Sequence, residues 1–409
     1  MTHAEVSIES IAAGGDGVAR ADGVVVFVPR TAPGDRARIS FETKKRFARG
    51  EIDELLAGAQ SRVNPLCYHY RVDRCGGCQL QHMRYDTQLE AKAGIIRDSL
   101  TRIGKRSVAA PAIEASDKQW RYRSKLTLAM RRRDDAHWTI GLHPYDDPTA
   151  VFQLADCPIT DDRVLAVCRE IMSARAHFPP ADELRASVQL TEGGASVVMQ
   201  GGNAWPTRGA FFQAVPLATA LWWRPAHRAR MLVAERGADA ASASFLQVNR
   251  GVGASLHAYV LERARAHDPR TLIDAYAGIG ATAIPLARDG VRVVAIESDR
   301  DAAARCAASL PEGSYAIPAK VEDALARALP ADVVLINPPR TGVHEHVSAM
   351  LQAQEPPPRA LVYVSCDPAT LARDLARMPR YRVVSLRAFD MFPQTAHVET
   401  VCELVPEAA

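Results

Sequence analysis

The chain has 409 residues, more than one compact domain usually holds, and this length predicts two or three domains. Hydrophobic residues make up 47% of it and charged residues 24%, a composition that excludes a disordered or fibrous protein. No apolar run reaches the roughly 18 residues needed to span a bilayer, and the opening Met-Thr-His-Ala-Glu lacks the features of a signal peptide. We therefore expect a cytoplasmic protein with no membrane association.

Residues 1–58 are predicted to form a small OB-like β-barrel. Short β-branched runs, such as residues 24–28, alternate with glycine turns, such as residues 14–17, and this spacing is typical of small all-β modules. Residues 44–49 combine basic side chains with the ring of Phe47, which suits nucleic-acid binding. The alternative is a plain β module with a solvated basic hairpin.

Residues 59–235 are predicted to form a central α+β domain. Its clearest element is a helix over residues 84–103, because apolar residues recur there with helical spacing and end near a glycine. The net charge of the chain is only +3, but between residues 61 and 135 there are 16 Lys and Arg against 8 Asp and Glu. Arg121, Arg123 and Lys125 alternate there with Trp120 and Tyr122. This pattern predicts a surface that faces RNA phosphates, and the alternative is a solvated basic face.

Four cysteines have the spacing of metal ligands. Cys67, Cys75 and Cys78 lie close together, and Cys157 follows much later. In a reducing compartment such a group predicts metal ligation and not a disulfide framework. Four thiolates can hold zinc or a [4Fe–4S] cluster, and the spacing alone favours neither.

Residues 236–409 are predicted to form an α/β domain. Short, nearly continuous apolar runs are separated by helix-length segments, at residues 271–274, 291–296, 331–336 and 360–364. This pattern indicates a parallel sheet with helices on both faces, as in Rossmann-like folds.

A glycine loop follows the first of these runs. Residues 274–281, Asp-Ala-Tyr-Ala-Gly-Ile-Gly-Ala, join a strand to a helix, so Gly278 and Gly280 let a ligand approach backbone amides at a helix start. Glu297, at the end of the next run, is the acid expected on a ribose hydroxyl. On its own, the loop suits S-adenosylmethionine and a nicotinamide dinucleotide equally.

Two later strand ends favour methyl transfer to a pyrimidine. Asn337, before two prolines, and Cys366, before Asp-Pro, follow two of the apolar runs, where open α/β sheets place their chemistry. Free cysteines are commonly buried core residues, but this position favours a nucleophile. C5 of uracil is too weak a nucleophile to accept a methyl group until a thiolate has added at C6.

That chemistry sets two further requirements. The C5 proton must be removed before the cysteine can leave, which needs a general base. Residues 397–399, His-Val-Glu, supply candidates. A thiol is mostly protonated at neutral pH, so we expect a positive charge or hydrogen bond near Cys366 that favours the thiolate.

Five ordered motifs resemble the RNA 5-methyluridine methyltransferases. They are Phe-Leu-Gln-Val-Asn at 245–249, the glycine loop at 274–280, Asn-Pro-Pro-Arg at 337–340, Ser-Cys-Asp-Pro-Ala-Thr-Leu-Ala-Arg-Asp at 365–374 and Asp-Met-Phe-Pro-Gln-Thr-Ala-His-Val-Glu at 390–399. The chain is most similar to the 23S ribosomal RNA branch. In that branch a TRAM barrel precedes an iron–sulfur segment and a Rossmann-like methyltransferase domain.

The resemblance implies a role for individual residues. Cys366 would be the nucleophile and Glu399 the general base. S-adenosylmethionine would be bound by Gln247, Tyr276, Gly278, Gly280, Glu297, Asp323 and Asn337. The metal group would be a [4Fe–4S] cluster on Cys67, Cys75, Cys78 and Cys157, although relatives usually have five residues between the first two cysteines and this chain has seven.

The chain departs from the family at two strand ends. It has Asn337 where the family usually has Asp, and Asp367 where the family usually has Asn. We predict that the Asn337 and Asp367 side chains lie close together, so that the exchange of amide and carboxylate moves a negative charge without removing it. Gln394 and Ala396 stand where the family more often has His and Gly.

Together, these features predict an RNA (uracil-C5-)-methyltransferase that acts on a uridine in 23S ribosomal RNA through a covalent adduct between Cys366 and C6. We expect ribosomal RNA as its partner and a monomer that requires no protein partner. The alternatives are a transfer-RNA enzyme, although such relatives generally lack the barrel and the cysteines, and a non-catalytic RNA-binding assembly factor with the same fold. Amine methylation is disfavoured because Arg340 stands where an aromatic residue would follow Asn-Pro-Pro.

Overall fold

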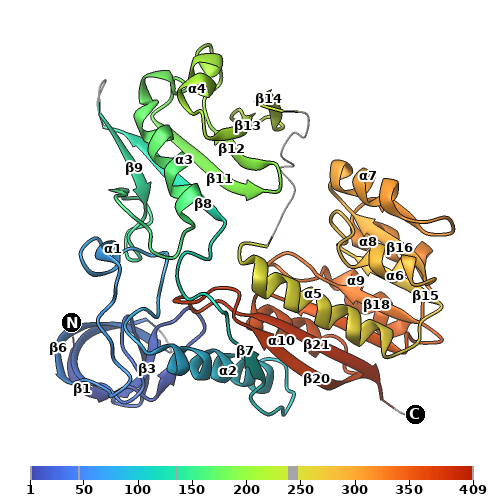
Figure 1. Cartoon of the computed structure of the whole chain (residues 1–409). Coiled ribbons are helices and arrows are strands. Elements are labelled where there is room, and N and C mark those ends of the chain that lie inside the picture. The colour runs from blue at the N-terminus through green and yellow to red at the C-terminus, as the bar shows by residue number, and fades with distance from the viewer. Residues whose placement is uncertain (1, 45–46, 134–136, 238–246, 408–409) are drawn as a thin grey trace.

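The residues that the structure describes form three β-sheets, which lie largely one after another along the chain (Figure 1). The structure is a computed structural model and describes residues 2–44, 47–133, 137–237 and 247–407. Within these ranges no helix combines the length and the apolar character that a membrane crossing requires.

The first sheet has six strands in the order β1-β5-β6-β4-β3-β2 and curls into the predicted barrel (Figure 1). Its strands are β1 (Thr2–Ser7), β2 (Ser10–Ile11), β3 (Gly17–Ala21), β4 (Val24–Val28), β5 (Arg36–Lys44) and β6 (Phe47–Ala57). Val26 and Ile39 are fully buried inside it, as the alternation of β-branched and polar residues requires. Phe47 is 52% exposed, and its ring lies edge-on to that of Phe27 with the ring centres 5.9 Å apart. Residues 45–46 of the basic segment lie outside the described residues.

The segment after the barrel joins the first sheet to the third. It contains α1 (Tyr68–Arg71), α2 (Tyr85–Arg102) and β7 (Ala112–Glu114), and α2 matches the predicted helix. Ile96 and Leu100 of α2 are buried in the core of the C-terminal sheet, and β7 pairs with β20 (Tyr381–Phe389) at the edge of that sheet. Residues 85–114, which the sequence places in the central domain, therefore pack on the C-terminal one. This long-range pairing leaves no local signal in the sequence.

The central sheet has seven strands in the order β10-β9-β8-β11-β12-β13-β14. They are β8 (Lys125–Arg132), β9 (Trp138–Leu142), β10 (Phe152–Gln153), β11 (Glu183–Thr191), β12 (Gly194–Gln200), β13 (Ala218–Arg224) and β14 (Met231–Glu235). On one face lie α3 (Asp162–Ser173), a 3₁₀ turn (Arg175–His177) and α4 (Arg208–Ala214). Leu184 and Val188 of β11 point into the core on this side, so the intervening residues point to the opposite face.

The C-terminal sheet has eight strands in the order β17-β16-β15-β18-β19-β21-β20-β7. Besides β7 and β20, its strands are β15 (Thr271–Ala275), β16 (Arg292–Glu297), β17 (Tyr315–Pro318), β18 (Val333–Ile336), β19 (Ala360–Ser365) and β21 (Glu399–Pro406). Those from β17 to β19 run parallel, which confirms the predicted parallel arrangement. The last strand, β21, is antiparallel and lies between β19 and β20.

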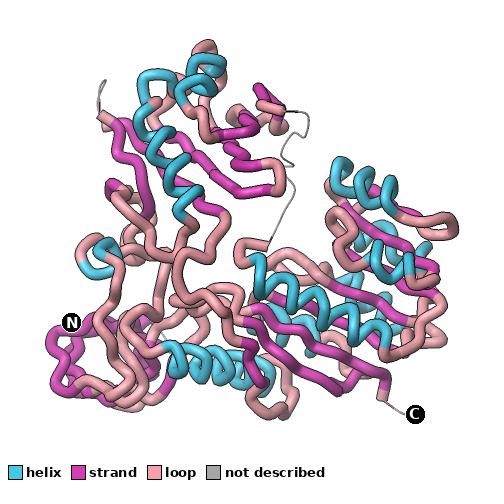
Figure 2. Tube along the Cα trace, viewed as in Figure 1, coloured by secondary structure: helices cyan, strands magenta, loops and turns pink. Residues whose placement is uncertain are grey.

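Helices cover both faces of this sheet (Figure 2). They are α5 (Arg250–Arg265), α6 (Ala283–Arg288), α7 (Arg300–Ser309), α8 (Val321–Ala328), α9 (Glu345–Ala353) and α10 (Pro368–Ala376). Leu272 packs into one core and Ile273 into the other, because successive side chains of a strand point to opposite faces. The apolar runs are continuous for this reason.

Candidate active site

The predicted site residues gather at one edge of the C-terminal sheet. The strands β15, β16, β18 and β19 are parallel neighbours, so their carboxyl ends meet at the same edge. Glu297 is the last residue of β16, while Asn337 directly follows β18 and Cys366 directly follows β19. Open parallel sheets bind ligands at this edge.

The glycine loop adopts a backbone suited to a ligand. Tyr276 and Gly278 have φ angles of 67° and 57°, in the left-handed region that glycine favours. A Cβ atom on Gly278 would meet nothing within 4 Å, whereas one on Gly280 would come within 2.8 Å of Cys306 Sγ. Space is therefore open beside Gly278, while Gly280 is required for packing.

Glu297 fixes this loop. Its Oε2 accepts a hydrogen bond from the Gly278 N–H at 2.9 Å, and its Oε1 accepts one from the Asp299 N–H at 2.7 Å. The carboxylate is thus held between the glycine loop and the start of α7, where the hydroxyls of a ribose could reach it. The loop, the open space and the acid together fit an adenosyl group.

The other predicted cofactor residues come from three separate elements. Asp323 lies in the first turn of α8, and the Asn337 N–H donates to the Ala275 carbonyl at 3.3 Å. Gln247 packs closely against Gly253 of α5. A Cβ atom added to Gly253 would lie 2.8 Å from the Cβ of Gln247. Phe245 and Leu246, from the same motif, lie outside the described residues.

Cys366 and Glu399 are brought together by the antiparallel pairing of β19 and β21. Ser365 pairs with Thr400, so the next position along places Cys366 opposite Glu399. The thiol is partly exposed, and the carboxyl is only 7% exposed. The sulfur atom is therefore accessible from outside while the carboxyl beside it is largely shielded from water.

Burial dominates the electrostatics of this pair. It raises the pKa of Glu399 to about 7, against the opposing charge of Arg340. Burial and the nearby Glu399 also raise the pKa of the Cys366 thiol, again against Arg340. Arg340 is the expected positive charge that favours the thiolate, but desolvation and the Glu399 carboxylate outweigh this one guanidinium.

Arg340 and His397 also lie at the site, and the sequence named only His397, as a candidate for the general base. Arg340 is the positive charge that acts on both Cys366 and Glu399. Burial, followed by the charge of Arg340, lowers the pKa of His397 to about 4, so this imidazole is neutral at pH 7. Arg340 belongs to the motif at 337–340, which could have identified it.

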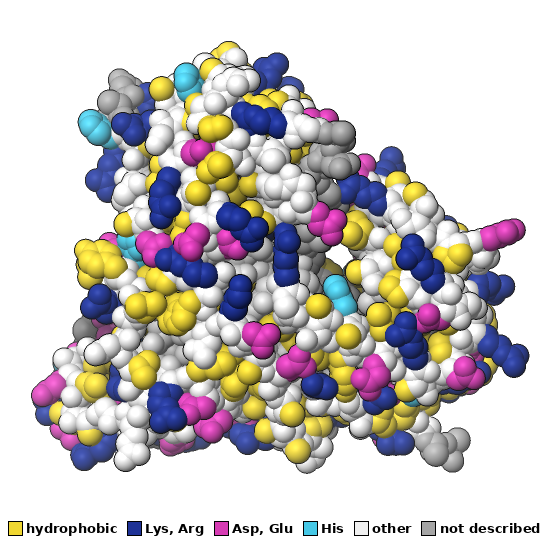
Figure 3. Space-filling view, viewed as in Figure 1, with side chains coloured by type: hydrophobic (Ala, Val, Ile, Leu, Met, Phe, Trp, Pro, Cys, Tyr) yellow, Lys and Arg dark blue, Asp and Glu magenta, His cyan; other side chains and the backbone are white. Residues whose placement is uncertain are grey.

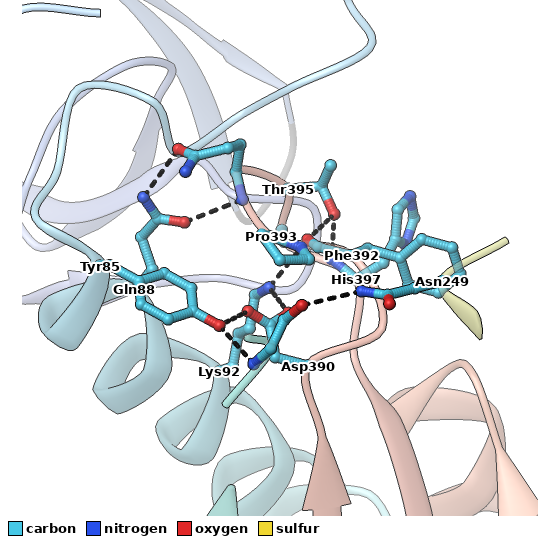
Figure 4. Close-up of polar contacts among 12 residues, drawn as sticks. Tyr85, Gln88, Lys92, Asn249, Asp390, Phe392, Pro393, Thr395 and His397 are labelled. Atoms are coloured by element: carbon cyan, nitrogen blue, oxygen red, sulfur yellow. Dashed lines mark hydrogen bonds and ion pairs between the residues drawn. The ribbon is translucent and has the colours of Figure 1, made fainter. Parts of the chain in front are cut away.

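A buried ion pair anchors the loop that leads to Glu399 (Figure 4). Lys92 of α2 and Asp390 at the end of β20 are both fully buried, with Nζ and Oδ1 2.5 Å apart. Lys92 also donates to the Phe392 carbonyl at 3.0 Å, and Tyr85 donates to the second Asp390 oxygen at 2.8 Å. The start of the loop is therefore fixed by a helix almost 300 residues earlier in the chain.

The middle of the loop is held by amide pairs. The Gln88 and Gln394 side chains meet at 3.0 Å, and the Gln394 N–H donates to Gln88 Oε1 at 3.0 Å. The backbone N–H groups of Gln79 and Leu80, directly after Cys78, donate to the Gln394 carbonyl at 3.2 and 3.0 Å. Gln394, which departs from the family pattern, thus joins the loop to both α2 and the cysteine segment.

Asp367 has a structural task. Its side chain accepts a hydrogen bond from the Thr370 N–H at 2.8 Å and caps the start of α10, with Pro368 in the first turn. Asn caps helices as well as Asp does, so this contact accounts for either residue. The predicted sharing of charge with Asn337 stays a prediction.

The four predicted metal ligands line one cavity of about 190 Å³, together with Arg123 and Lys125. Burial raises the pKa of Cys75 to about 12 and also raises that of Cys157. The donor set is of the kind that binds zinc or iron–sulfur clusters. In the described part of the chain, however, no three His, Cys, Asp or Glu side chains are arranged so that they could hold a metal ion. The four cysteines therefore line the same cavity but are not arranged as a complete metal site.

Part of the predicted basic surface is used internally. Arg121 bonds Asp156 at 3.0 Å, Arg131 bonds Glu183 at 2.6 Å, and Tyr122 is buried with its hydroxyl on the Pro393 carbonyl. Tyr122 therefore supports the loop at 390–397 and cannot stack on a base. Lys and Arg side chains still gather over the middle of the molecule, between the central and C-terminal sheets (Figure 3).

A parallel sheet with a glycine loop after its first strand, and with an antiparallel last strand inserted beside a partly exposed cysteine, defines a Rossmann-like methyltransferase domain. The family model for tRNA (uracil-5-)-methyltransferases matches residues 320–405, and that for the TRAM domain matches residues 2–52. The chain belongs to the RNA (uracil-C5-)-methyltransferase family.

Full-length relatives support this assignment. The chain is 31% identical to an uncharacterized RNA methyltransferase of Thermosynechococcus vestitus, covering 98% of this chain and 97% of the relative. It is 29% identical to a 23S rRNA (uracil(1939)-C(5))-methyltransferase of Thiobacillus denitrificans, covering 97% and 98%. Its fold is similar to that of the Pyrococcus abyssi tRNA (uracil-54, C5)-methyltransferase in complex with S-adenosyl-L-homocysteine, with a TM-score of 0.72, 22% identity, and 98% and 99% of the two chains covered.

Proposed function

We propose that the protein methylates C5 of a uridine in 23S ribosomal RNA through a covalent adduct between Cys366 and C6. The observation that carries this proposal is the placement of a partly exposed thiol opposite a buried carboxyl, at the same edge of the sheet as the glycine loop. A binding protein gains nothing from a buried carboxyl whose pKa lies near 7, whereas a general base does.

The chemistry divides between the two side chains. The Cys366 thiol first loses its proton to solvent, and the thiolate adds to C6 of the uracil, so that the electron pair of the C5–C6 bond makes C5 nucleophilic. S-adenosylmethionine, when bound, would supply an electrophilic methyl group to C5 and leave as S-adenosylhomocysteine. Glu399 then removes the proton from C5, and the electron pair left behind expels the Cys366 sulfur and restores the ring. Arg340 stabilises the negative charge that passes through this site.

The cofactor would be bound by the loop and its neighbours. Glu297 would accept hydrogen bonds from the ribose hydroxyls, and Gly278 leaves room for the adenosyl group. The remaining contacts would come from Gln247, Tyr276, Gly280, Asp323 and Asn337.

Ribosomal RNA is the preferred substrate because a TRAM barrel and a cysteine cavity accompany the catalytic domain, as expected for the 23S branch. The alternative is a transfer RNA, the substrate named for the similar Pyrococcus structure. Mass mapping of methylated uridines in 23S rRNA and tRNA from a deletion strain separates the two. Loss of a methyl group from tRNA alone would contradict the proposal.

Trapping the adduct tests the mechanism directly. With S-adenosylmethionine and RNA, Glu399→Gln should accumulate a covalent protein–RNA species on denaturing gels, because the C5 proton cannot leave. Cys366→Ala should form no adduct, lose more than about 10³-fold in rate, as nucleophile removal does, and still bind RNA. Adduct formation by Cys366→Ala would contradict the role given to its sulfur.

We further propose that Cys67, Cys75, Cys78 and Cys157 hold a [4Fe–4S] cluster. Their common cavity and their sulfur donors support this, and cluster binding would draw the thiols closer while releasing their protons. Anaerobically purified protein should contain about four iron and four sulfide per chain and absorb near 400 nm. Cys157→Ser should lose iron, whereas Cys168→Ser, a buried cysteine outside the set, should keep it. Stoichiometric zinc would overturn the assignment.

We propose that the chain is divided into domains at residues 1–58, 59–235 and 236–409. We also propose that the protein is monomeric, requires no protein partner and is located in the cytoplasm. The packing of residues 85–114 on the C-terminal sheet means that the central domain would not fold as one separate unit.

A further inference from the structure

The second face of the central sheet forms one wall of a cleft. While α3 and α4 lie on the first face, the second face presents Lys125, Ser187, Gln189, Ser196 and Trp222 to a cleft of about 440 Å³. The opposite wall includes Asp299 and Asp301 of the C-terminal domain. The polar face is not required for the core, since the apolar residues of these strands point the other way.

The strand register gathers these side chains into neighbours. Gln189 of β11 pairs with Lys125 of β8 on one side and with Ser196 of β12 on the other. Directly opposite residues of paired strands point to the same face and lie next to each other. Lys125, Gln189 and Ser196 therefore form a continuous row across three strands, and Trp222 lies one strand further on.

Three hydrogen-bonding atoms on this face have no partner among the residues that the structure describes. Within those ranges Gln189 Nε2, Ser196 Oγ and Trp222 Nε1 are buried without a hydrogen bond, and Gln189 and Ser196 are only 8% and 3% exposed. Elsewhere on the same face polar groups are paired, as Thr127 Oγ1 and Ser187 Oγ are at 2.6 Å. Buried polar groups without partners are rare in folded proteins and call for an explanation.

The charge around these atoms is positive on the sheet side. Arg228 and Arg230 line the cleft, and the Arg230 guanidinium lies 4.9 Å from the Trp222 ring centre. Burial, together with the charges of Arg123 and Arg230, lowers the pKa of Lys125. A ligand with oxygen acceptors and negative charge would reduce the repulsion among these positive charges, whereas a cation would increase it.

The cleft is adjacent to the proposed methyl-transfer site. Ser124, next to Lys125, donates its N–H to the Val248 carbonyl at 2.8 Å, beside the proposed cofactor residue Gln247. On the other wall Asp299 is bonded to Glu297. An RNA strand that presents a uridine to Cys366 thus has this cleft within reach.

We propose that this face binds a nucleotide of the substrate RNA that neighbours the methylated uridine in the fold. Its base packs against Trp222, and its carbonyl or phosphodiester oxygens accept hydrogen bonds from Gln189 Nε2 and Ser196 Oγ. Aromatic rings and amide donors are the usual means of holding unpaired RNA bases. This inference rests on the proposed function, because it takes RNA as the substrate.

The double variant Gln189→Leu/Ser196→Ala tests the proposal. Removing unpaired buried polar groups stabilises a fold, so its melting temperature should be equal to or above that of the wild type. Its KM for RNA should rise about tenfold or more, as loss of two hydrogen bonds to substrate implies. The kcat at saturating RNA and the affinity for S-adenosylmethionine should stay unchanged.

Ser173→Ala serves as the matched control, because Ser173 is exposed on α3, on the other side of the sheet. It should change neither the melting temperature nor the KM. An unchanged KM in the double variant would overturn the proposal, and so would a fall in melting temperature, since that would show a structural role for these donors. A wild-type protein that methylates no RNA would instead refute the proposed function. In that case the binding of single-stranded RNA oligonucleotides to the same variants still decides the inference.

Discussion

The two side chains of the proposed catalytic pair are positioned in different ways. Cys366 is held by its own surroundings in the sequence, between the end of β19 and the start of α10, which Asp367 caps. Glu399 follows a loop that is held from far away, by Lys92 and Gln88 of α2 and by the backbone after Cys78. Local structure therefore fixes the nucleophile, whereas the position of the base depends on the docking of distant elements. Substitutions that affect the loop before Glu399 should therefore change stability and activity much more than substitutions beside Cys366.

The largest effect is expected from Lys92→Met. This substitution leaves Asp390 as a buried charge without its cation, which costs about 3–5 kcal/mol in comparable pairs. Methyl transfer should also fall, because the loop before Glu399 loses its anchor. Denaturant unfolding and single-turnover kinetics measure the two effects.

The double variant Lys92→Met/Asp390→Asn is the control for this prediction. It removes both charges and should recover part of the lost stability. A single variant that loses less than about 1 kcal/mol would show that the ion pair does not anchor the loop.

A smaller effect, with a characteristic pH dependence, is expected from Glu399→Gln. Burial raises the folded-state pKa of Glu399 from 4.5 to about 7, so its contribution to stability is complete below pH 4.5 and is lost as the pH rises through 7. Glu399→Gln should therefore be more stable than the wild type at pH 8, by on the order of 2 kcal/mol, and equally stable at pH 4. Urea denaturation at both pH values measures the difference.

The same shift predicts the pH dependence of the wild-type reaction. The base must be ionised and the thiol must lose its proton, and burial raises both pKa values. The value of kcat/KM should rise with pH through about 7. A rate that is constant from pH 5.5 to 8.5 would contradict a titrating base at this position.

The smallest effect is expected on the locally held side. Asp367→Asn should change stability by less than about 0.5 kcal/mol, because both residues cap helices, whereas Asp367→Ala should cost about 1 kcal/mol. Activity of Asp367→Asn should stay within about threefold of the wild type. A tenfold loss would instead indicate that the carboxylate has an electrostatic role, as the predicted exchange of charge with Asn337 requires.

The same contrast explains what the sequence could predict. The four parallel strands, the glycine loop and the strand-end position of Cys366 depend on local patterns, and all appear in the structure. The apolar stripe of α2 was also visible, yet Lys92 occupies a position on that stripe, and its partner Asp390 directly follows β20. Such a pairing joins residues almost 300 positions apart, and only the fold reveals it.

What the sequence did not predict is the surroundings of individual side chains, whereas the helices and strands at these positions were expected. A positive charge does lie near Cys366, but burial and Glu399 together outweigh Arg340. Tyr122, which the sequence placed on a surface facing RNA phosphates, is buried and supports the loop at 390–397. Desolvation and side-chain orientation depend on the whole fold, and a single sequence does not encode them in any short window.

The position of β21 between β19 and β20 has a consequence for the assembly of the sheet. Since β21 follows both of its neighbours in the chain, the sheet has a gap beside the end of β19 until β21 inserts. A folding intermediate without this insertion would carry the reactive sulfur without its proton acceptor. Assembly of the sheet and completion of the catalytic pair are therefore the same event.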